Sequence, residues 1–249
     1  EMVIRDWSSD VCSSDLYPDA QALAYEAAAQ IAALLSEAIA ARKSATLALS
    51  GGSTPHLTYT LLAAHFSERV DWQRVQIFWG DERCVPPDHP ESNYRMAYET
   101  LLTQVSIPEA NIHRMQGELP PDEAALAYEQ ELRAVFGEAA IPRFDLILLG
   151  LGDNGHVASI FPGTAAIEEH TRWVVAHYIE SLESWRLTFT PPLLNAAATA
   201  LFLVSGSRKG RRLKQVREGP YRPQRLPAQI VAPTDGKLLW LVDAQAAQA

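Results

Sequence analysis

One segment, residues 144–163, constrains the fold of this chain more than any other. It reads FDLILLGLGDNGHVASIFPG: a short apolar run ends at Gly150, and a loop with two further glycines leads to His156. A continuous apolar run of this length, closed by glycine, indicates a strand buried on both faces, as in parallel sheets. Open α/β sheets bind ligands beyond the carboxyl ends of such strands. The sequence therefore predicts that His156 lies where such a sheet carries its chemistry.

Apolar strands and helices alternate along the rest of the chain. Asp19 is expected to cap a long alanine-rich helix over 20–42. The other expected elements are strands at 46–50, 75–79, 144–150, 173–176, 186–190, 200–204 and 238–242, and helices at 53–62, 92–104, 122–136 and 207–217. Alternation of this kind indicates βαβ units. We therefore expect a single α/β domain with a largely parallel central sheet flanked by helices.

Residues 1–16 do not read like the rest of the chain, because the triplet Ser-Ser-Asp occurs twice, at 8–10 and 13–15. The segment resembles a translated sequencing adapter, so it is expected to be non-native and is set apart from the domain at 17–249. A natural polar N-terminal arm is the alternative. If the segment is foreign, the native first strand is in doubt.

Composition narrows the classes of function. The formal net charge of −9 argues against nucleic acid as a partner, because nucleic-acid binding needs a broad basic surface. Two cysteines are too few for a disulfide framework, so a reducing cytoplasm is expected. No apolar run approaches the roughly 18 residues that span a bilayer, and no secretory signal is visible, so no membrane partner is expected.

The segment LALSGGSTP, residues 47–55, has the pattern of a strand, a glycine turn and a helix start. Two glycines allow a ligand to approach the backbone, and a helix start offers free amides and a favourable dipole to an anion such as phosphate. Ser53 or Thr54 is expected to cap this helix. The candidate phosphate-binding residues are Ser50, Gly51, Gly52, Ser53 and Thr54. The alternative is an ordinary capped turn between a strand and a helix.

A second strand-end loop, GDERCVPPDHP, places Asp81 and Glu82 beside Arg83. The guanidinium of Arg83 suits bidentate binding of a phosphate or carboxylate, and either acid suits a sugar hydroxyl. A surface ion pair is the alternative, and the sequence does not separate the roles of the two acids. Asn93, close behind, is either a helix cap or a side chain that reaches into the cleft.

The residues around His156 exclude some kinds of site. No His or Cys lies at a metal-ligand spacing nearby, and no G-x-S-x-G elbow accompanies a catalytic triad. A lone imidazole at a strand-end loop can serve as a general base toward water. A structural histidine is the alternative.

Together these loops resemble the 6-phosphogluconolactonase family. The matching segments, in the family's order, are LSGGSTP, FWGDERCVPPDHPESNYRMA, IPEANIHRM, FDLILLGLGDNGHVASIFPG, SWRLTFTPPLLNAA, LFLVSGSRKG and LPAQIVAPTDGKLLWLVD. The resemblance implies a modified Rossmann-like fold related to glucosamine-6-phosphate deaminases and ribose-5-phosphate isomerases. It implies hydrolysis of 6-phospho-D-glucono-1,5-lactone in the oxidative pentose phosphate pathway, with no metal or organic cofactor.

The resemblance also implies roles for single residues. His156 matches the family's general base, Gly51 to Thr54 match its phosphate loop, and Arg83 and Lys209 match residues that hold the anionic substrate. Arg186 and Asn195 match positions near the site. Asn154 stands where many lactonases have Asp, so it can orient His156 only through a neutral hydrogen bond.

Two other functions remain open. A glucosamine-6-phosphate deaminase or isomerase would share the cradle and the histidine loop, although such enzymes follow the histidine with a segment like FNEP, where this chain has ASIFP. A non-catalytic sugar-phosphate-binding protein would need the cradle and Lys209 but not His156. The sequence does not reveal the oligomeric state.

Overall fold

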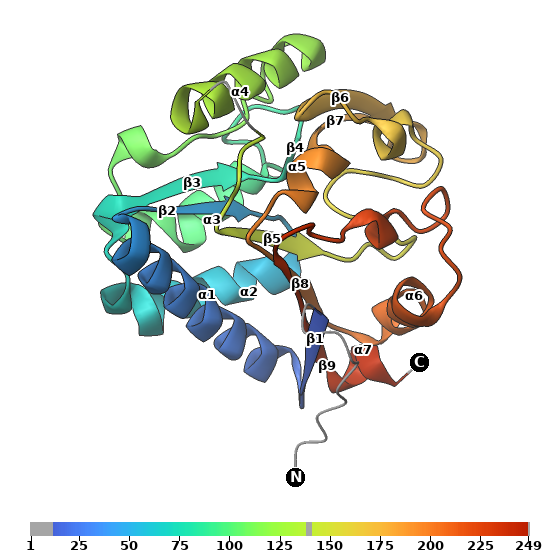
Figure 1. Ribbon diagram of the computed structural model, residues 1–249, viewed down its shortest axis with the longest axis horizontal. Helices are drawn as coiled ribbons and strands as arrows, with labels where there is room; N and C mark the ends of the chain where they lie inside the picture. Colours follow the sequence, from blue (N-terminus) through green and yellow to red (C-terminus); the bar gives the residue numbers. More distant parts are fainter. Residues whose placement is uncertain (1–11, 138–140, 249) are drawn as a thin grey trace.

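The computed structural model describes residues 12–137 and 141–248 (Figure 1). Its central sheet has six strands, all parallel, in the order β1-β9-β8-β5-β2-β3. The strands are β1 (Cys12–Tyr17), β2 (Ala45–Leu49), β3 (Val75–Trp79), β5 (Leu146–Gly150), β8 (Thr199–Val204) and β9 (Lys237–Asp243). The expected α/β fold with a parallel central sheet is confirmed.

A second, antiparallel sheet lies beside the first, in the order β4-β7-β6. Its strands are β4 (Asp81–Arg83), β6 (Val174–Ile179) and β7 (Ser184–Phe189). Gly80 joins the two sheets, because its N–H donates to Leu49 of β2 and its carbonyl accepts from Phe189 of β7. The sequence pattern predicts strands near β6 and β7 but no separate sheet. It treats β4 as loop, because three charged residues carry no apolar signal.

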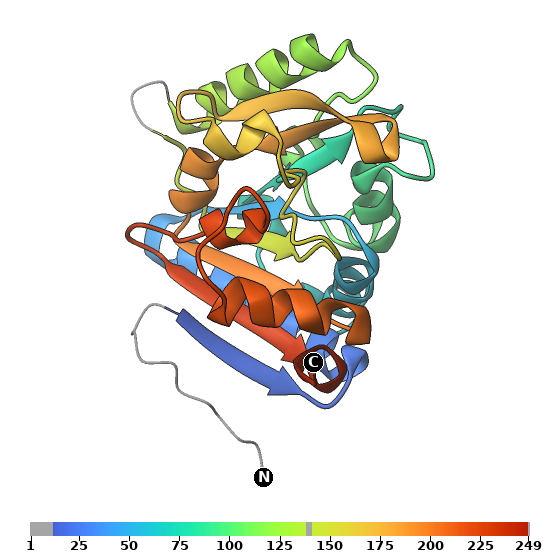
Figure 2. The same cartoon turned by 90° about the vertical axis from the view of Figure 1, so that its right-hand side faces the viewer.

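The helices cover the central sheet and the small sheet (Figures 1 and 2). They are α1 (Ala20–Arg42), α2 (Ser53–Phe66), α3 (Asn93–Thr100), α4 (Pro121–Phe136), α5 (Pro191–Asn195), α6 (Ser207–Glu218) and α7 (Ala244–Ala247). Helices α1 and α2 pack on each other and on strands of the central sheet, whereas α4 packs on β6 and β7. Asp19 caps α1 as expected, since its carboxylate accepts from the N–H of Ala22 at 2.8 Å.

Helix α1 corrects one expectation, because by length and composition it could cross a membrane. One side of the helix is instead buried in the core, with Leu23, Ile31 and Leu35 fully covered. Core helices of globular proteins have the same length and composition, and α1 packs as one of them.

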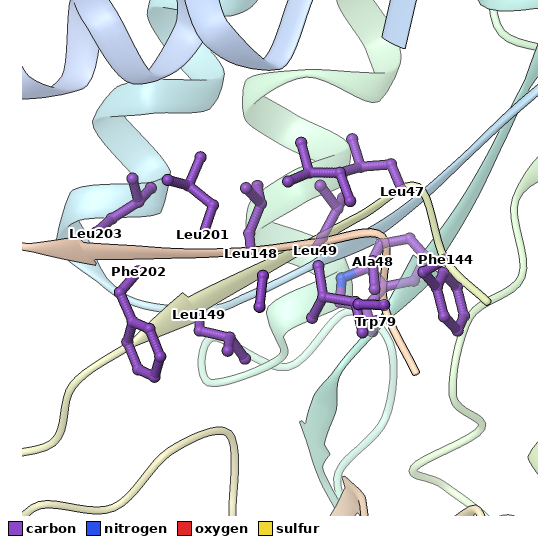
Figure 3. Close-up of a cluster of buried hydrophobic side chains, with 14 of the residues drawn as sticks. Leu47, Ala48, Leu49, Trp79, Phe144, Leu148, Leu149, Leu201, Phe202 and Leu203 are labelled. Carbon is purple, nitrogen blue, oxygen red and sulfur yellow. The ribbon is translucent and has the colours of Figure 1, made fainter. Parts of the chain in front are cut away.

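The core lies on both faces of the central sheet (Figure 3). Leu47, Leu148 and Leu201 point toward α1 and α2, whereas Leu149 and Phe202 point to the opposite side. All five side chains are at most 1% exposed. Burial on both faces favours apolar side chains throughout these strands, which explains why they appear in the sequence as largely apolar runs.

The described part of the N-terminal segment belongs to the sheet. Residues 12–17 form edge strand β1, paired in parallel with β9 so that Leu16 lies opposite Val242. The structure thus supplies a first strand from residues that the sequence pattern sets apart. The foreign origin of residues 1–16, and the start of the domain at 17, stay predictions.

Strand order decides where a ligand can enter. The chain passes from β2 to its neighbour β3 and then returns to β5 on the other side of β2. Where the order of strands reverses in this way, the loops that follow two adjacent strands diverge and leave a crevice. Here those loops are the glycine turn after β2 and the histidine loop after β5.

Candidate active site

A pocket of about 400 Å³ occupies this crevice at the carboxyl ends of the parallel strands. Nine of the candidate site residues line it, namely Ser50, Gly51, Gly52, Ser53, Thr54, Asp81, Arg83, His156 and Lys209. Asn154 and Arg186 are not part of the lining, but Asn154 contacts His156 and Arg186 lies opposite Arg83 on the neighbouring strand. The structure therefore brings the glycine turn and the imidazole into one pocket, as the sequence analysis requires.

The glycine turn presents backbone rather than a side-chain cap. Helix α2 begins at Ser53, its N-cap is Gly52 with φ +106°, and no side chain in the described part of the chain caps it. The expectation that Ser53 or Thr54 caps the helix is wrong, because both lie in its first turn. Their N–H groups stay available for an anion at the positive end of the helix dipole.

The main chain of this turn is held by contacts with two side chains, Tyr59 and Asn93. The hydroxyl of Tyr59 bonds both the N–H and the carbonyl of Ser50, each at 2.9 Å. Gly51 lies against the side-chain amide of Asn93, so that a Cβ at Gly51 would fall 1.9 Å from Asn93 Oδ1. Asn93 also lines the pocket, which agrees with its reaching into the cleft.

The imidazole of His156 is fixed by its own loop. Its ring packs against Gly152, where a Cβ would fall 2.0 Å from Nδ1, and stacks on Phe161 with ring centroids 4.1 Å apart. Asn154 Oδ1 accepts from the backbone N–H of His156 at 3.1 Å and lies 2.7 Å from Nδ1. Since this oxygen is an acceptor, the neutral ring carries its proton on Nδ1 and has its lone pair on Nε2.

The surroundings keep this ring neutral. Burial lowers the pKa of His156 to about 4, and the positive charges of Lys209, Arg186 and Arg83 act in the same direction. The carboxylate of Asp153 opposes them. At neutral pH the imidazole is therefore an acceptor of protons.

The three cations come from different elements. Lys209, in the first turn of α6, pairs with Asp153 at 2.5 Å. Arg83 of β4 donates to the carbonyl of Glu91, and Arg186 lies directly opposite it on β7. Arg186 is only 8% exposed and donates to Ser184 Oγ at 2.9 Å. Their positive field makes the pocket attractive to an anion although the whole chain is acidic.

The structure separates the two neighbouring acids. Asp81 lines the pocket, and its Oδ2 accepts from the hydroxyl of Ser159 at 2.7 Å. Glu82 is 1% exposed and binds the start of α3, where it accepts from the N–H groups of Asn93 and Tyr94, both at 2.8 Å. Glu82 is therefore a structural cap, while Asp81 is available to a ligand.

Other residues differ from the sequence analysis. Asn195 lies outside the pocket lining and braces the chain by bonding the carbonyl of Ile230 and the N–H of Ala232. The helix expected at 207–217 is present as α6, but the sequence analysis does not assign its start to the site: α6 begins at Ser207 after Gly206 (φ +94°) and lines the same pocket. The strand-glycine-helix pattern in LFLVSGSRKG could have revealed it, but only Lys209 was singled out there.

These features define a class: an α/β protein with a Rossmann-like parallel sheet, whose pocket at the strand ends combines helix starts, cations and a neutral imidazole. The family model described as glucosamine-6-phosphate isomerases/6-phosphogluconolactonase matches residues 18–240. The chain belongs to this family.

Curated relatives and solved structures agree with this assignment. A 6-phosphogluconolactonase of Synechocystis is 43% identical over 237 residues, which cover 94% of this chain and 96% of the relative. One from Nostoc is 39% identical, with 93% and 95% covered. The crystal structure of a 6-phosphogluconolactonase from Thermotoga maritima superposes with a TM-score of 0.81 at 30% identity and covers 93% of this chain and 99% of its own.

Proposed function

We propose that this protein hydrolyses 6-phospho-D-glucono-1,5-lactone to 6-phospho-D-gluconate, in the oxidative pentose phosphate pathway. The relatives named 6-phosphogluconolactonase, similar along nearly their whole length, support the substrate. One observation of the structure carries the chemistry: a neutral imidazole shares a pocket with an uncapped helix start. The imidazole can activate water for attack, and the helix start can bind a phosphate.

His156 is the general base in this proposal. Its Nε2 removes a proton from a water molecule while the water oxygen forms a bond to the lactone carbonyl carbon. The π electrons of the carbonyl bond move to the carbonyl oxygen, which becomes the oxyanion. The tetrahedral intermediate then collapses, the bond from that carbon to the ring oxygen breaks, and the imidazolium returns the proton to the leaving oxygen. Asn154 keeps the proton on Nδ1 throughout, and thus keeps Nε2 reactive.

The phosphate and the developing oxyanion are held by different groups. The amides of Ser53 and Thr54, with Lys209, bind the phosphate at one end of the pocket. Arg83 lines the pocket together with His156 and stabilises the oxyanion. Arg186, opposite Arg83 on the neighbouring strand, adds a second positive charge. Binding at the phosphate fixes the position of the lactone carbon without taking part in the bond changes.

A coupled assay tests the function. Fresh lactone is produced by oxidation of glucose 6-phosphate, and its disappearance is followed with a correction for spontaneous hydrolysis. We expect the protein to accelerate hydrolysis far above the spontaneous rate. Hydrolysis at the spontaneous rate would reject the proposal, and release of ammonia from glucosamine 6-phosphate would favour the deaminase alternative. Binding of 6-phosphogluconate without any turnover would indicate a binding protein.

The proposal includes the cellular setting. We place the enzyme in the cytoplasm, with a small sugar phosphate and neither nucleic acid nor membrane as its partner. The acidic charge and the two cysteines support this placement. Fractionation of the source cells, followed by detection of the protein, tests it.

A further inference from the structure

The ammonium group that would bind the phosphate already has a carboxylate partner in the protein. Lys209 Nζ lies 2.5 Å from Asp153 Oδ1. Lys209 lines the pocket from the first turn of α6, while Asp153 belongs to the loop that carries His156. A phosphate that approaches Lys209 therefore meets a second anion at the same ammonium.

This ion pair is of a kind that can be exchanged. The side chain of Asp153 is 54% exposed and that of Lys209 is 27% exposed. Pairs this exposed are weak, because water competes for both partners. The loop does not depend on the carboxylate for its position, since the carbonyl of Asp153 also accepts from Arg212 Nε of α6 at 3.0 Å.

Lys209 differs in this respect from the other cations that act on His156. Arg83 donates to a carbonyl oxygen and Arg186 to a hydroxyl, and within the described residues neither forms a salt bridge with a carboxylate. Asp153 is thus the carboxylate that pairs with one of these cations and that raises the pKa of the imidazole. The guanidinium of Arg208 adds a further positive charge beside Asp153.

We propose that Asp153 is an internal competitor of the substrate phosphate: its carboxylate holds Lys209 and releases it to the phosphate when substrate binds. The inference rests on the proposed function in one respect, that the incoming anion is the phosphate of a sugar. Asp153 sets affinity and takes no part in the bond changes. Such a residue limits how tightly substrate, product and free phosphate are held.

The exchange also protects the imidazole from a change in charge. Lys209 lowers the pKa of His156, and Asp153 raises it. A phosphate monoester carries a charge of roughly −1.5 to −2 at neutral pH, so when it replaces the carboxylate at Lys209 the ammonium group near the ring still has an anionic partner. Removing Asp153 should therefore change the pKa of His156 most in the protein without phosphate. It should also change KM more than kcat.

The test is a double-mutant cycle read by calorimetry with inorganic phosphate, using Asp153→Asn, Lys209→Gln and the double variant. Asp153→Asn should bind phosphate about two- to fivefold more tightly than the wild type, the range expected for an exposed ion pair. In the Lys209→Gln background the same change should have little effect. The matched control is Glu218→Gln, which removes one negative charge at the exposed far end of α6 and should leave phosphate affinity unchanged.

Two further measurements separate competition from a structural role. An NMR titration should show a lower pKa for His156 in Asp153→Asn than in the wild type when phosphate is absent, and a smaller difference when it is present. Lactone kinetics should show a lower KM with kcat within about twofold. Unchanged or weaker phosphate binding in Asp153→Asn, an equal gain in Glu218→Gln, or no measurable binding to the wild type would overturn the proposal. Absence of lactone turnover together with an intact phosphate cycle would reject the enzyme function alone.

Discussion

The two loops that form the pocket differ in the groups that they present to it: one presents backbone groups and the other a side chain. After β2, the backbone offers binding groups, because α2 starts at Ser53 without a side-chain cap. After β5, a single side chain, His156, carries the chemistry that we propose, and Asn154 and Phe161 contact its ring. We infer that substitutions after β2 change affinity modestly, whereas the loss of one ring after β5 removes catalysis.

The same residue type makes both arrangements possible. At Gly51 a Cβ would collide with Asn93, and at Gly152 it would collide with the ring of His156. Each glycine admits a close neighbour, which in one case fixes a backbone turn and in the other fixes the reacting ring. The two loops therefore differ in function, but both need a glycine that leaves room for a close neighbour.

The largest effect is expected at the ring. His156→Ala should lower kcat by about 10²–10⁴-fold with little change in KM, because it removes the general base and leaves the phosphate grip intact. Steady-state kinetics with freshly made lactone measures both constants. Full activity in this variant would contradict the mechanism, and an unchanged thermal transition would show that the fold is preserved.

A smaller effect, on KM more than on kcat, is expected at Lys209, the cation that binds the phosphate in the proposed mechanism. Lys209→Ala should raise KM by about 10–100-fold, the range of a hydrogen bond to a charged group, with a smaller change in kcat. Initial rates over a wide range of lactone concentration separate the two constants. If kcat falls and KM stays the same, Lys209 acts on the transition state and the division between the loops is wrong.

The pH profile examines the electrostatics of the histidine loop. In the wild type kcat/KM should be constant at neutral pH and fall as the pH drops through about 4, where the lowered pKa of His156 lets the base become protonated. Asn154→Asp places a carboxylate beside Nδ1, favours the imidazolium, and should move this acid limb upward by about one unit. Rates measured from pH 3.5 to 7 reveal the shift. A limb that stays in place or moves downward would rule out this role for Asn154.

The smallest effect is expected at a side chain of the glycine turn. Ser53→Ala keeps the backbone N–H and removes one hydroxyl, so KM should rise by no more than about tenfold. Isothermal titration with phosphate provides an independent value. A loss as large as that of Lys209→Ala would mean that side chains, and not the helix start, hold the anion.

Much of the fold could be predicted because strong local signals mark it. Strands β2, β3, β5, β8 and β9 belong to the central sheet and are mostly apolar, so each leaves a largely apolar run in the sequence. Helix α1 carries a clear cap at Asp19. The small antiparallel sheet has no such signal, because strand pairing is decided by side chains and turns far apart along the chain.

The sequence predicted individual residues of the candidate site but not how they are arranged or divide their roles. The glycine turn and His156 could be recognised, and the structure places both in one pocket. The division between Asp81 and Glu82 could not, since it depends on which carboxylate meets the start of α3. Equally, nothing local marks Asn195 as a brace for the chain rather than a residue of the pocket.

The sequence alone determined which chemical groups follow which strands: glycines and hydroxyls after one apolar run, an imidazole after another, a lysine after a third. Only the tertiary structure decided that these groups meet, and in what state of charge. The reason is physical. Residue order fixes local geometry, but the pKa of His156 and the pairing of Lys209 with Asp153 depend on burial and on charges that the sheet brings together from distant parts of the chain.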